Sequence, residues 1–211
     1  MFYQDTLEPR LRFGDVLKGF ISVTPLINQP PLFSEANNNF HIEVTHYDFY
    51  VVLSPCCSIN DQVIALSPLK KIRNTFFDNP YFAEDLTRIN RQMLPSRTVP
   101  PKVWENFTDE ERQRRQLEES AFAFSELFIY EKNPLFSEYT LHKKDGSKVT
   151  TSCYMIDFRH AFRVGCTQIT NNTSPTKGTK VLQLTIDTRK ELREKISYYF
   201  VRPPKEDKIE V

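Results

Sequence analysis

The chain has 211 residues, of which 39% are hydrophobic and 26% are charged. This composition excludes a disordered polar chain and is typical of a soluble globular protein large enough for one sizeable domain. The formal net charge is only +1, so no overall electrostatic field would draw the protein to nucleic acid or to anionic lipid.

The first third of the chain predicts β-strands. Residues 1–15 lack the apolar core of a signal peptide, and no later run reaches the length of a membrane span. We therefore expect a cytoplasmic protein with reduced cysteines and no membrane contact. The predicted strand segments are 14–24, 40–54 and 61–69, with Val51, Val52, Val63 and Ile64 as core residues. The connector 24–39 is rich in Pro and Asn and predicts an exposed loop.

The middle of the chain, about 74–119, changes to a helical period. In a helix predicted within 80–94, one face carries Phe82, Leu86, Ile89 and Met93. Thr108 and Glu111 have the spacing of a capping box, which predicts the start of a further helix. We therefore expect two or three helices inserted between strands. The residues expected to dock them are Phe82, Leu86, Ile89, Trp104 and Leu117.

The last part of the chain returns to strands and ends in a helix. Residues 139–158 predict a hairpin that turns on Asp145-Gly146. A helix is predicted over 187–202, with Asp187 as its cap, and it ends before Pro203. Its expected inward residues are Leu192, Ile196, Tyr199 and Phe200. Together these elements predict a single domain over 1–204, followed by a charged tail or linker at 205–211.

The adjacent cysteines Cys56 and Cys57 raise the question of an active site. Neighbouring cysteines cannot easily form a disulfide with each other, and the spacing of the remaining Cys and His residues matches no metal-ligand pattern. A nucleophilic cysteine would need a base, for which His46 is nearest in the sequence. The favoured interpretation is that both pack as small apolar residues at the end of a strand. No nucleotide-binding motif occurs, so we expect neither a metal nor a cofactor.

Several short motifs, taken in order, resemble the MazF/PemK toxin family. They are Gly14-Asp15-Val16, Val52-Leu53-Ser54-Pro55 and Pro68-Leu69. The run "LSPCCSI" and the segment Asp157-Phe158-Arg159 resemble signatures of uncharacterised prokaryotic relatives of that family. The resemblance implies an α+β fold with a small SH3-like β-barrel, often dimeric, here with a helical insertion and a C-terminal helix.

The true toxins of that family are endoribonucleases that need no metal, and the resemblance implies this activity as one possibility for the chain. Their chemistry depends on an Arg before the V-L-S strand and on a Thr after the P-[IL] pair, and these positions fall on Asp48 and Lys70. A carboxylate at the first position would repel the scissile phosphate instead of stabilising it. If a ribonuclease nevertheless survives, the residues expected to carry it are Lys70, Lys71, Arg73 and His46.

The favoured function is therefore a non-catalytic, MazF-like regulatory module that binds another protein. The expected partner is an antitoxin, regulator or protease of a prokaryotic toxin–antitoxin or antiviral (CRISPR-type) defence system, held inactive until it is cleaved or released. RNA is a less favoured partner. The alternatives are an endoribonuclease toxin of the MazF/PemK type and an unrelated mixed α/β domain without a barrel.

Overall fold

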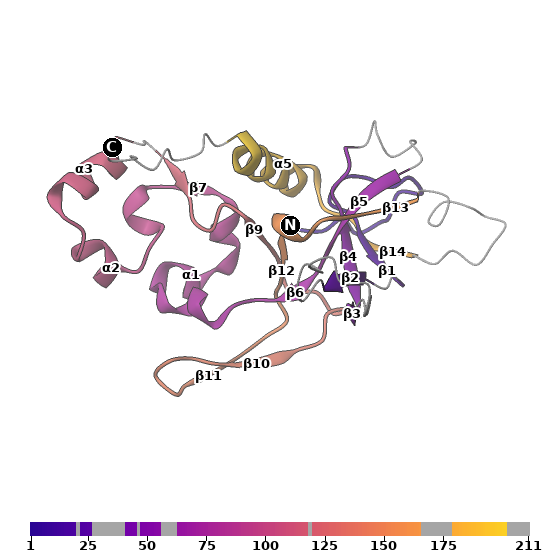
Figure 1. Cartoon of the computed structure of the whole chain (residues 1–211), viewed down its shortest axis with the longest axis horizontal. Coiled ribbons are helices and arrows are strands. Elements are labelled where there is room, and N and C mark those ends of the chain that lie inside the picture. The colour runs from indigo at the N-terminus through magenta and orange to yellow at the C-terminus, as the bar shows by residue number, and fades with distance from the viewer. Residues whose placement is uncertain are drawn as a thin grey trace, which may run out of the picture. The chain divides into compact units, whose positions relative to one another are not determined.

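The structure of the chain is a computed structural model, and it describes residues 1–19, 22–26, 41–45, 47–55, 63–117, 120–165 and 179–201. Two compact units can be distinguished. The sheet unit comprises Thr6–Leu69 and Ala161–Gln183, and the helical unit comprises Met1–Asp5, Lys70–His160 and Leu184–Val211. Figure 1 labels the elements of both units in chain order.

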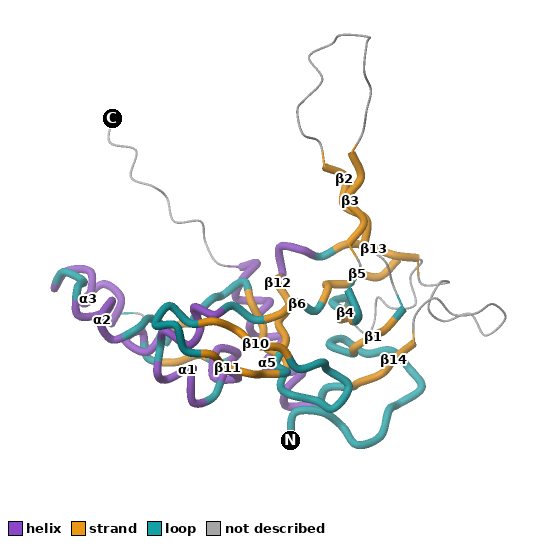
Figure 2. Tube along the Cα trace, turned by 90° about the horizontal axis from the view of Figure 1, so that it is seen from below, coloured by secondary structure: helices purple, strands orange, loops and turns teal. Residues whose placement is uncertain are grey.

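An antiparallel five-stranded sheet forms the centre of the sheet unit, in the order β13-β5-β4-β1-β14 (Figure 2). Its strands are β1 (Val16–Lys18), β4 (Phe49–Val52), β5 (Val63–Pro68), β13 (Phe162–Gly165) and β14 (Thr179–Leu182). A separate antiparallel pair is formed by β2 (Ser22–Leu26) and β3 (His41–Thr45). The described strands thus make open antiparallel sheets and not a closed barrel, while the α+β class is confirmed.

The core of this sheet consists of apolar residues that β-type patterning predicts. Its fully buried members are Leu17, Tyr50, Val52, Ile64 and Leu66. The Tyr50 ring meets the ring of Phe162 edge-on, with 5.5 Å between their centres. Val51 is also fully buried, so three of the four predicted core residues are confirmed, and the side chain of Val63 lies outside the described part.

The helical unit contains a second, three-stranded antiparallel sheet in the order β6-β12-β9. Its strands are β6 (Lys70–Lys71), β9 (Leu127–Tyr130) and β12 (Tyr154–Asp157). The predicted hairpin is confirmed as β10 (Tyr139–His142) and β11 (Lys148–Thr151), and Gly146 supplies the positive φ of 82° in its turn. A short pair joins β7 (Gln92–Met93) to β8 (Ala121–Phe122).

The helices expected at about 74–119 are present, but in shorter pieces than predicted. They are η2 (Asn74–Asp78), α1 (Pro80–Glu84), η3 (Leu86–Asn90), η4 (Pro95–Arg97), α2 (Pro101–Glu105) and α3 (Asp109–Gln116). The predicted helix within 80–94 breaks at Asp85, which is extended (φ −152°, ψ 106°) and whose side chain accepts the N–H of Thr87. The four residues of its predicted face are all buried nevertheless.

The Thr108–Glu111 capping box is confirmed. The N–H of Glu111 donates to Thr108 Oγ1 over 3.2 Å, and the N–H of Thr108 donates to Glu111 Oε2 over 3.0 Å. The expected docking of Leu117 is wrong, because its side chain is 79% exposed. Trp104 is only half-buried.

The chain's longest described helix is α5 (Ile186–Val201), which follows a short η5 (Phe158–His160) and strands β13 and β14. Thr185, and not the predicted Asp187, accepts the N–H of Thr188 and caps its first turn. Leu192 is buried as predicted, but Phe200 is 69% exposed, so its expected inward position is wrong. Among the helices that the structure describes, none combines the length and the apolar character needed to cross a membrane.

Candidate anion-binding site

Two of the predicted ribonuclease residues, Lys70 and Arg73, belong to one charged cluster, whereas Lys71 makes a different contact. Lys70 and Lys71 form β6 opposite Met155 and Tyr154 of β12, and their side chains alternate across the sheet. The Nζ of Lys71 lies 5.2 Å from the centre of the Tyr139 ring. Lys70 instead interacts electrostatically with a group of charged residues at the end of β12. His46, Cys56 and Cys57 lie outside the described residues, so the predictions for them stay predictions.

Asp157, the last residue of β12, organises that group. Its side chain is only 4% exposed. Asp157 Oδ1 accepts hydrogen bonds from the backbone N–H of Arg159 (3.1 Å) and from its Nε (2.8 Å), and Oδ2 accepts from its Nη2 (2.6 Å). His160 Nδ1 lies 3.2 Å from Oδ2, and Arg73 Nη2 lies 3.8 Å from it. One buried carboxylate thus gathers three cationic or titratable side chains.

The charges of this cluster shift the pKa values of Asp157 and Lys70. Burial by itself raises the pKa of Asp157, but the hydrogen bonds and charge of Arg159 outweigh it and hold the pKa below its usual value. Burial lowers the pKa of Lys70; Asp157 opposes this effect, whereas the positive charges of Arg159 and Arg73 add to it. The two arginines therefore repel Lys70, which shows that positive charge is crowded here.

The positive charge is also the accessible charge. The side chains of Arg73, Arg159 and His160 are 40%, 48% and 53% exposed, whereas the Asp157 carboxylate lies beneath them. Glu126 is a second carboxylate close enough to raise the pKa of Arg159. Lys70, Arg73 and Arg159 together still exceed these two carboxylates by one charge. Chemically, this surface can hold an oxyanion through charge-assisted hydrogen bonds.

His160 gives the site a second capability. Because its Nδ1 faces Asp157, Nε2 is the nitrogen that can meet another molecule. A carboxylate that orients an imidazole in this way is a recurring acid–base arrangement. The spacing of the histidines matched no metal-ligand pattern, and this role of His160 was not predicted. The available signal was an Asp followed by Arg and His two and three residues later, which a tight turn brings back onto the carboxylate.

The motif Gly14-Asp15-Val16 serves the backbone of the sheet unit. Gly14, with a φ of 86°, donates its N–H to Val52 O over 2.7 Å, and the N–H of Val52 donates to Asp15 O over 2.9 Å. Asp15 is fully buried, and its Oδ2 accepts the N–H of Arg12 (2.7 Å) and pairs with Lys180 Nζ (2.7 Å). This motif therefore fixes the entry into β1.

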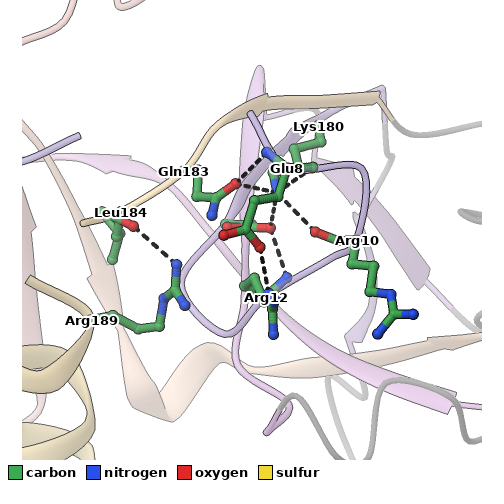
Figure 3. A network of polar contacts seen from close by, with 8 residues as sticks. Glu8, Arg10, Arg12, Lys180, Gln183, Leu184 and Arg189 are labelled. Atoms are coloured by element: carbon green, nitrogen blue, oxygen red, sulfur yellow. Dashed lines mark hydrogen bonds and ion pairs between the residues drawn. The ribbon is translucent and has the colours of Figure 1, made fainter. Parts of the chain in front are cut away.

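Lys180 extends that support to the N-terminal loop (Figure 3). Its Nζ donates to Glu8 O (3.0 Å), Arg10 O (2.9 Å) and Gln183 Oε1 (2.6 Å). The N–H of Glu8 also donates to Gln183 Oε1 over 2.9 Å. A single ammonium group thus ties β14 to residues before β1.

The second motif, Val52-Leu53-Ser54-Pro55, is structural as well. Ser54 Oγ accepts the N–H of Ala65 over 2.8 Å, and the N–H of Leu53 donates to Ala65 O over 2.8 Å. Both bonds join the end of β4 to β5. Asp48, which the resemblance aligns with the Arg of the toxins, is an exposed residue of the sheet unit.

A separate hollow of about 390 Å³ lies within the helical unit, between η3 and β11. Its lining includes Phe77, Glu84, Leu86, Lys132, Thr151 and Cys153. Cys153 is 5% exposed, and burial raises the pKa of its thiol, so the thiol is poorly suited to act as a nucleophile. Within the described residues, no three His, Cys, Asp or Glu side chains converge on a metal position.

No match to this chain was found among protein-family models, curated proteins or solved structures. The site is therefore interpreted from its own chemistry. That chemistry consists of a fixed cationic surface and one oriented imidazole, both built on Asp157.

Proposed function

We propose that the chain is a non-catalytic, MazF-like protein-interaction module of a prokaryotic toxin–antitoxin or antiviral (CRISPR-type) defence system. In this proposal it works in the cytoplasm and holds a partner protein, such as an antitoxin, regulator or protease, until that partner is cleaved or released. The observation that carries the proposal is the commitment of the site's cations to Asp157.

Arg159 uses two of its side-chain nitrogens and its backbone N–H on that one carboxylate. A guanidinium held in this way presents a fixed charge at a fixed angle, which suits recognition of a complementary surface. It is less suited to following the changing charge of a reacting phosphate, since its strongest hydrogen bonds are already made. The exposed carboxylate of Asp48, at the position of the family's Arg, supports the same interpretation.

The test is co-expression of the tagged chain with the products of the genes that flank its own gene. We expect a stable complex to be recovered, and Arg73→Gln to weaken it because one of the exposed cations is lost. Lys71→Gln is the matched control, since Lys71 carries the same charge on the same short strand as Lys70 and lies against Tyr139. The proposal is wrong if no flanking protein binds or if both variants weaken the complex equally.

A second candidate function, a metal-independent endoribonuclease, is favoured by one observation, the pairing of His160 with Asp157 beside Arg73. His160 Nε2 would take the proton of a ribose 2′-hydroxyl while that oxygen attacks the neighbouring phosphorus. The 5′-oxygen would leave with a proton from water, and a 2′,3′-cyclic phosphate would remain. Arg73 and Lys70 would stabilise the charge of the phosphorane.

Cleavage of a long single-stranded RNA in the presence of a chelator decides between the two functions. Cleavage that disappears in both His160→Ala and Lys70→Ala would show that the chain is a ribonuclease. It would contradict the proposal that the module is non-catalytic. Cleavage that survives both substitutions comes from a contaminant and leaves the first proposal standing.

A further inference from the structure

The helices α2 and α3, with the residues that join them up to Leu117, form an arm that is almost entirely on the surface. Neither helix contains a buried residue, and both pack against η4. In both views they lie at the same end of the helical unit (Figure 1, Figure 2). A helix of this length gains little stability from its backbone alone, and packing against the short η4 adds little to it.

The arm exposes apolar and aromatic surface. Val103 is 41% exposed and Leu117 is 79% exposed. Trp104 and Phe107 are half-buried, their ring centres are 5.8 Å apart, and the guanidinium of Arg115 lies 4.4 Å from the centre of the Phe107 ring. Trp, aromatic and Arg side chains of this kind are enriched at the energetic centres of protein interfaces.

The charges on α3 are divided along its length. Its first turn carries Asp109, Glu110 and Glu111, and its last turn carries Arg114 and Arg115. Asp109 is 97% exposed, so its ion pair with Arg112 is open to water and weak. An antiparallel copy of the same helix would place each acidic turn opposite a basic turn, whereas a parallel copy would oppose like charges.

We propose that this arm is a self-association surface, on which a second copy of the chain docks with its α3 antiparallel across a two-fold axis. A two-fold interface requires a surface that is complementary to itself, and the divided charge of α3 meets that requirement. Burial of Trp104, Phe107 and Leu117 supplies the attraction. The ion pairs between the acidic turn of one copy and the basic turn of the other set the orientation. This inference does not depend on the partner protein proposed above.

Two short helices per copy make a small interface, so the association is weak and depends on concentration. The chain offers a direct reporter, because Trp104 is its only tryptophan. Its emission is expected to shift to shorter wavelength as the protein is concentrated from about 1 µM to several hundred µM, the range in which small interfaces associate. Sedimentation over the same range should show a dimer and no larger species, because a two-fold interface closes on itself.

A charge exchange tests the antiparallel arrangement. Arg114→Glu with Arg115→Glu makes both ends of α3 acidic and leaves Arg112 as its one basic residue, whereas Asp109→Lys with Glu110→Lys makes α3 predominantly basic. Each double variant alone should dissociate at least about tenfold more readily, because like charges then face each other. An equimolar mixture should restore the dimer as a heterodimer. Circular dichroism on each variant shows whether the fold is retained.

The control is Lys190→Glu with Arg193→Glu on α5, which lowers the net charge as much as Arg114→Glu with Arg115→Glu does, at exposed residues of another helix. That variant should associate like the wild type. A wild-type chain that stays monomeric at all concentrations would overturn the proposal, whether or not another protein binds the arm. Failure of the complementary mixture to associate would overturn it as well.

Discussion

The side chain of Asn90 takes the place of a neighbouring strand beside Ile129. Asn90 Nδ2 donates to Ile129 O over 2.8 Å, and the N–H of Ile129 donates to Asn90 Oδ1 over 2.7 Å. Ile129 lies in β9, at the edge of the β6-β12-β9 sheet, and Asn90 is 1% exposed at the end of η3. The buried amide of Asn90 thus hydrogen-bonds both the N–H and the C=O of one residue on an edge strand, and it ties η3 to the sheet.

This pairing predicts a large effect of Asn90→Leu. The substitution keeps the side chain's approximate size but leaves the N–H and C=O of Ile129 buried without partners, which costs about 2–4 kcal/mol of unfolding free energy. Urea denaturation measures it. Asn74→Leu is the control, because Asn74 makes a single exposed hydrogen bond to His142 O and its loss should cost about 0.5 kcal/mol. Equal losses in the two variants would contradict the role given to Asn90.

A second prediction concerns Lys195 of α5, which is fully buried. Its Nζ donates to Ile89 O and to Ala123 O, the latter over 3.1 Å. Burial lowers the pKa of Lys195 well below its usual value, and Glu126 opposes this only in part. The unfolded chain therefore binds a proton that the folded chain binds poorly. Stability should rise with pH between the folded pKa and about 10.4, by at most about 1.4 kcal/mol per pH unit.

Lys195→Met should remove most of that pH dependence, because Met carries no proton in either state. The measurement is the unfolding free energy in urea at pH 7, 8 and 9 for both proteins. Lys190→Met, an exposed residue of the same helix, should keep the slope of the wild type. If Lys195→Met retains the slope too, Lys195 is protonated in the folded protein and the prediction fails.

The local features of this fold were readable in the sequence. The Thr108–Glu111 capping box depends on residues three apart, and it forms as the spacing predicts. The apolar faces of α1 and η3 were also identified correctly, since periodicity reports which side chains share a face. Periodicity does not report whether another surface covers that face. For this reason Leu117 and Phe200, both predicted to point inward, are exposed.

The candidate site could be predicted only in part, for a related reason. Arg159 and His160 reach Asp157 through a single tight turn, so their sequence spacing carried the information. Arg73 reaches the same carboxylate from far away in the chain, after β6 pairs with β12. The burial of Lys195 is harder to predict from the sequence. Its two hydrogen-bond acceptors are backbone carbonyls, which every residue carries.

A third prediction follows from the ion pair of Lys180 with Asp15 in the sheet unit. Lys180→Met leaves the fully buried Asp15 carboxylate without this cation, and loss of one member of a buried pair costs about 3–5 kcal/mol. Adding Asp15→Asn to that variant removes the buried charge and should recover part of the loss. Thermal unfolding of Lys180→Met, Asp15→Asn and the double variant tests this. A double variant that is as unstable as the sum of the two single ones would show that the two residues do not interact.

The last prediction concerns the anion site. Inorganic phosphate should bind beside Arg73 and Arg159, because these two with Lys70 exceed the negative charge of Asp157 and Glu126 by one, and their side chains are 40% and 48% exposed. At a phosphate concentration tenfold above its Kd, binding adds about 1.4 kcal/mol to the folded state and raises Tm by about 3–6 °C. Sodium chloride at equal ionic strength serves as the reference, since phosphate also stabilises proteins in a general way.

Three variants test whether phosphate acts at the Asp157 cluster. Arg73→Gln should reduce the phosphate-specific rise, whereas Lys71→Gln, on the same strand as Lys70 and against Tyr139, should preserve it. Asp157→Asn removes the buried negative charge, so this variant should be less stable than the wild type without phosphate. Its Tm should rise more with phosphate than that of the wild type, because phosphate then neutralises cations that have lost their partner. Equal rises in Arg73→Gln and Lys71→Gln would mean that phosphate acts on the whole protein surface and that the Asp157 cluster only stabilises the fold.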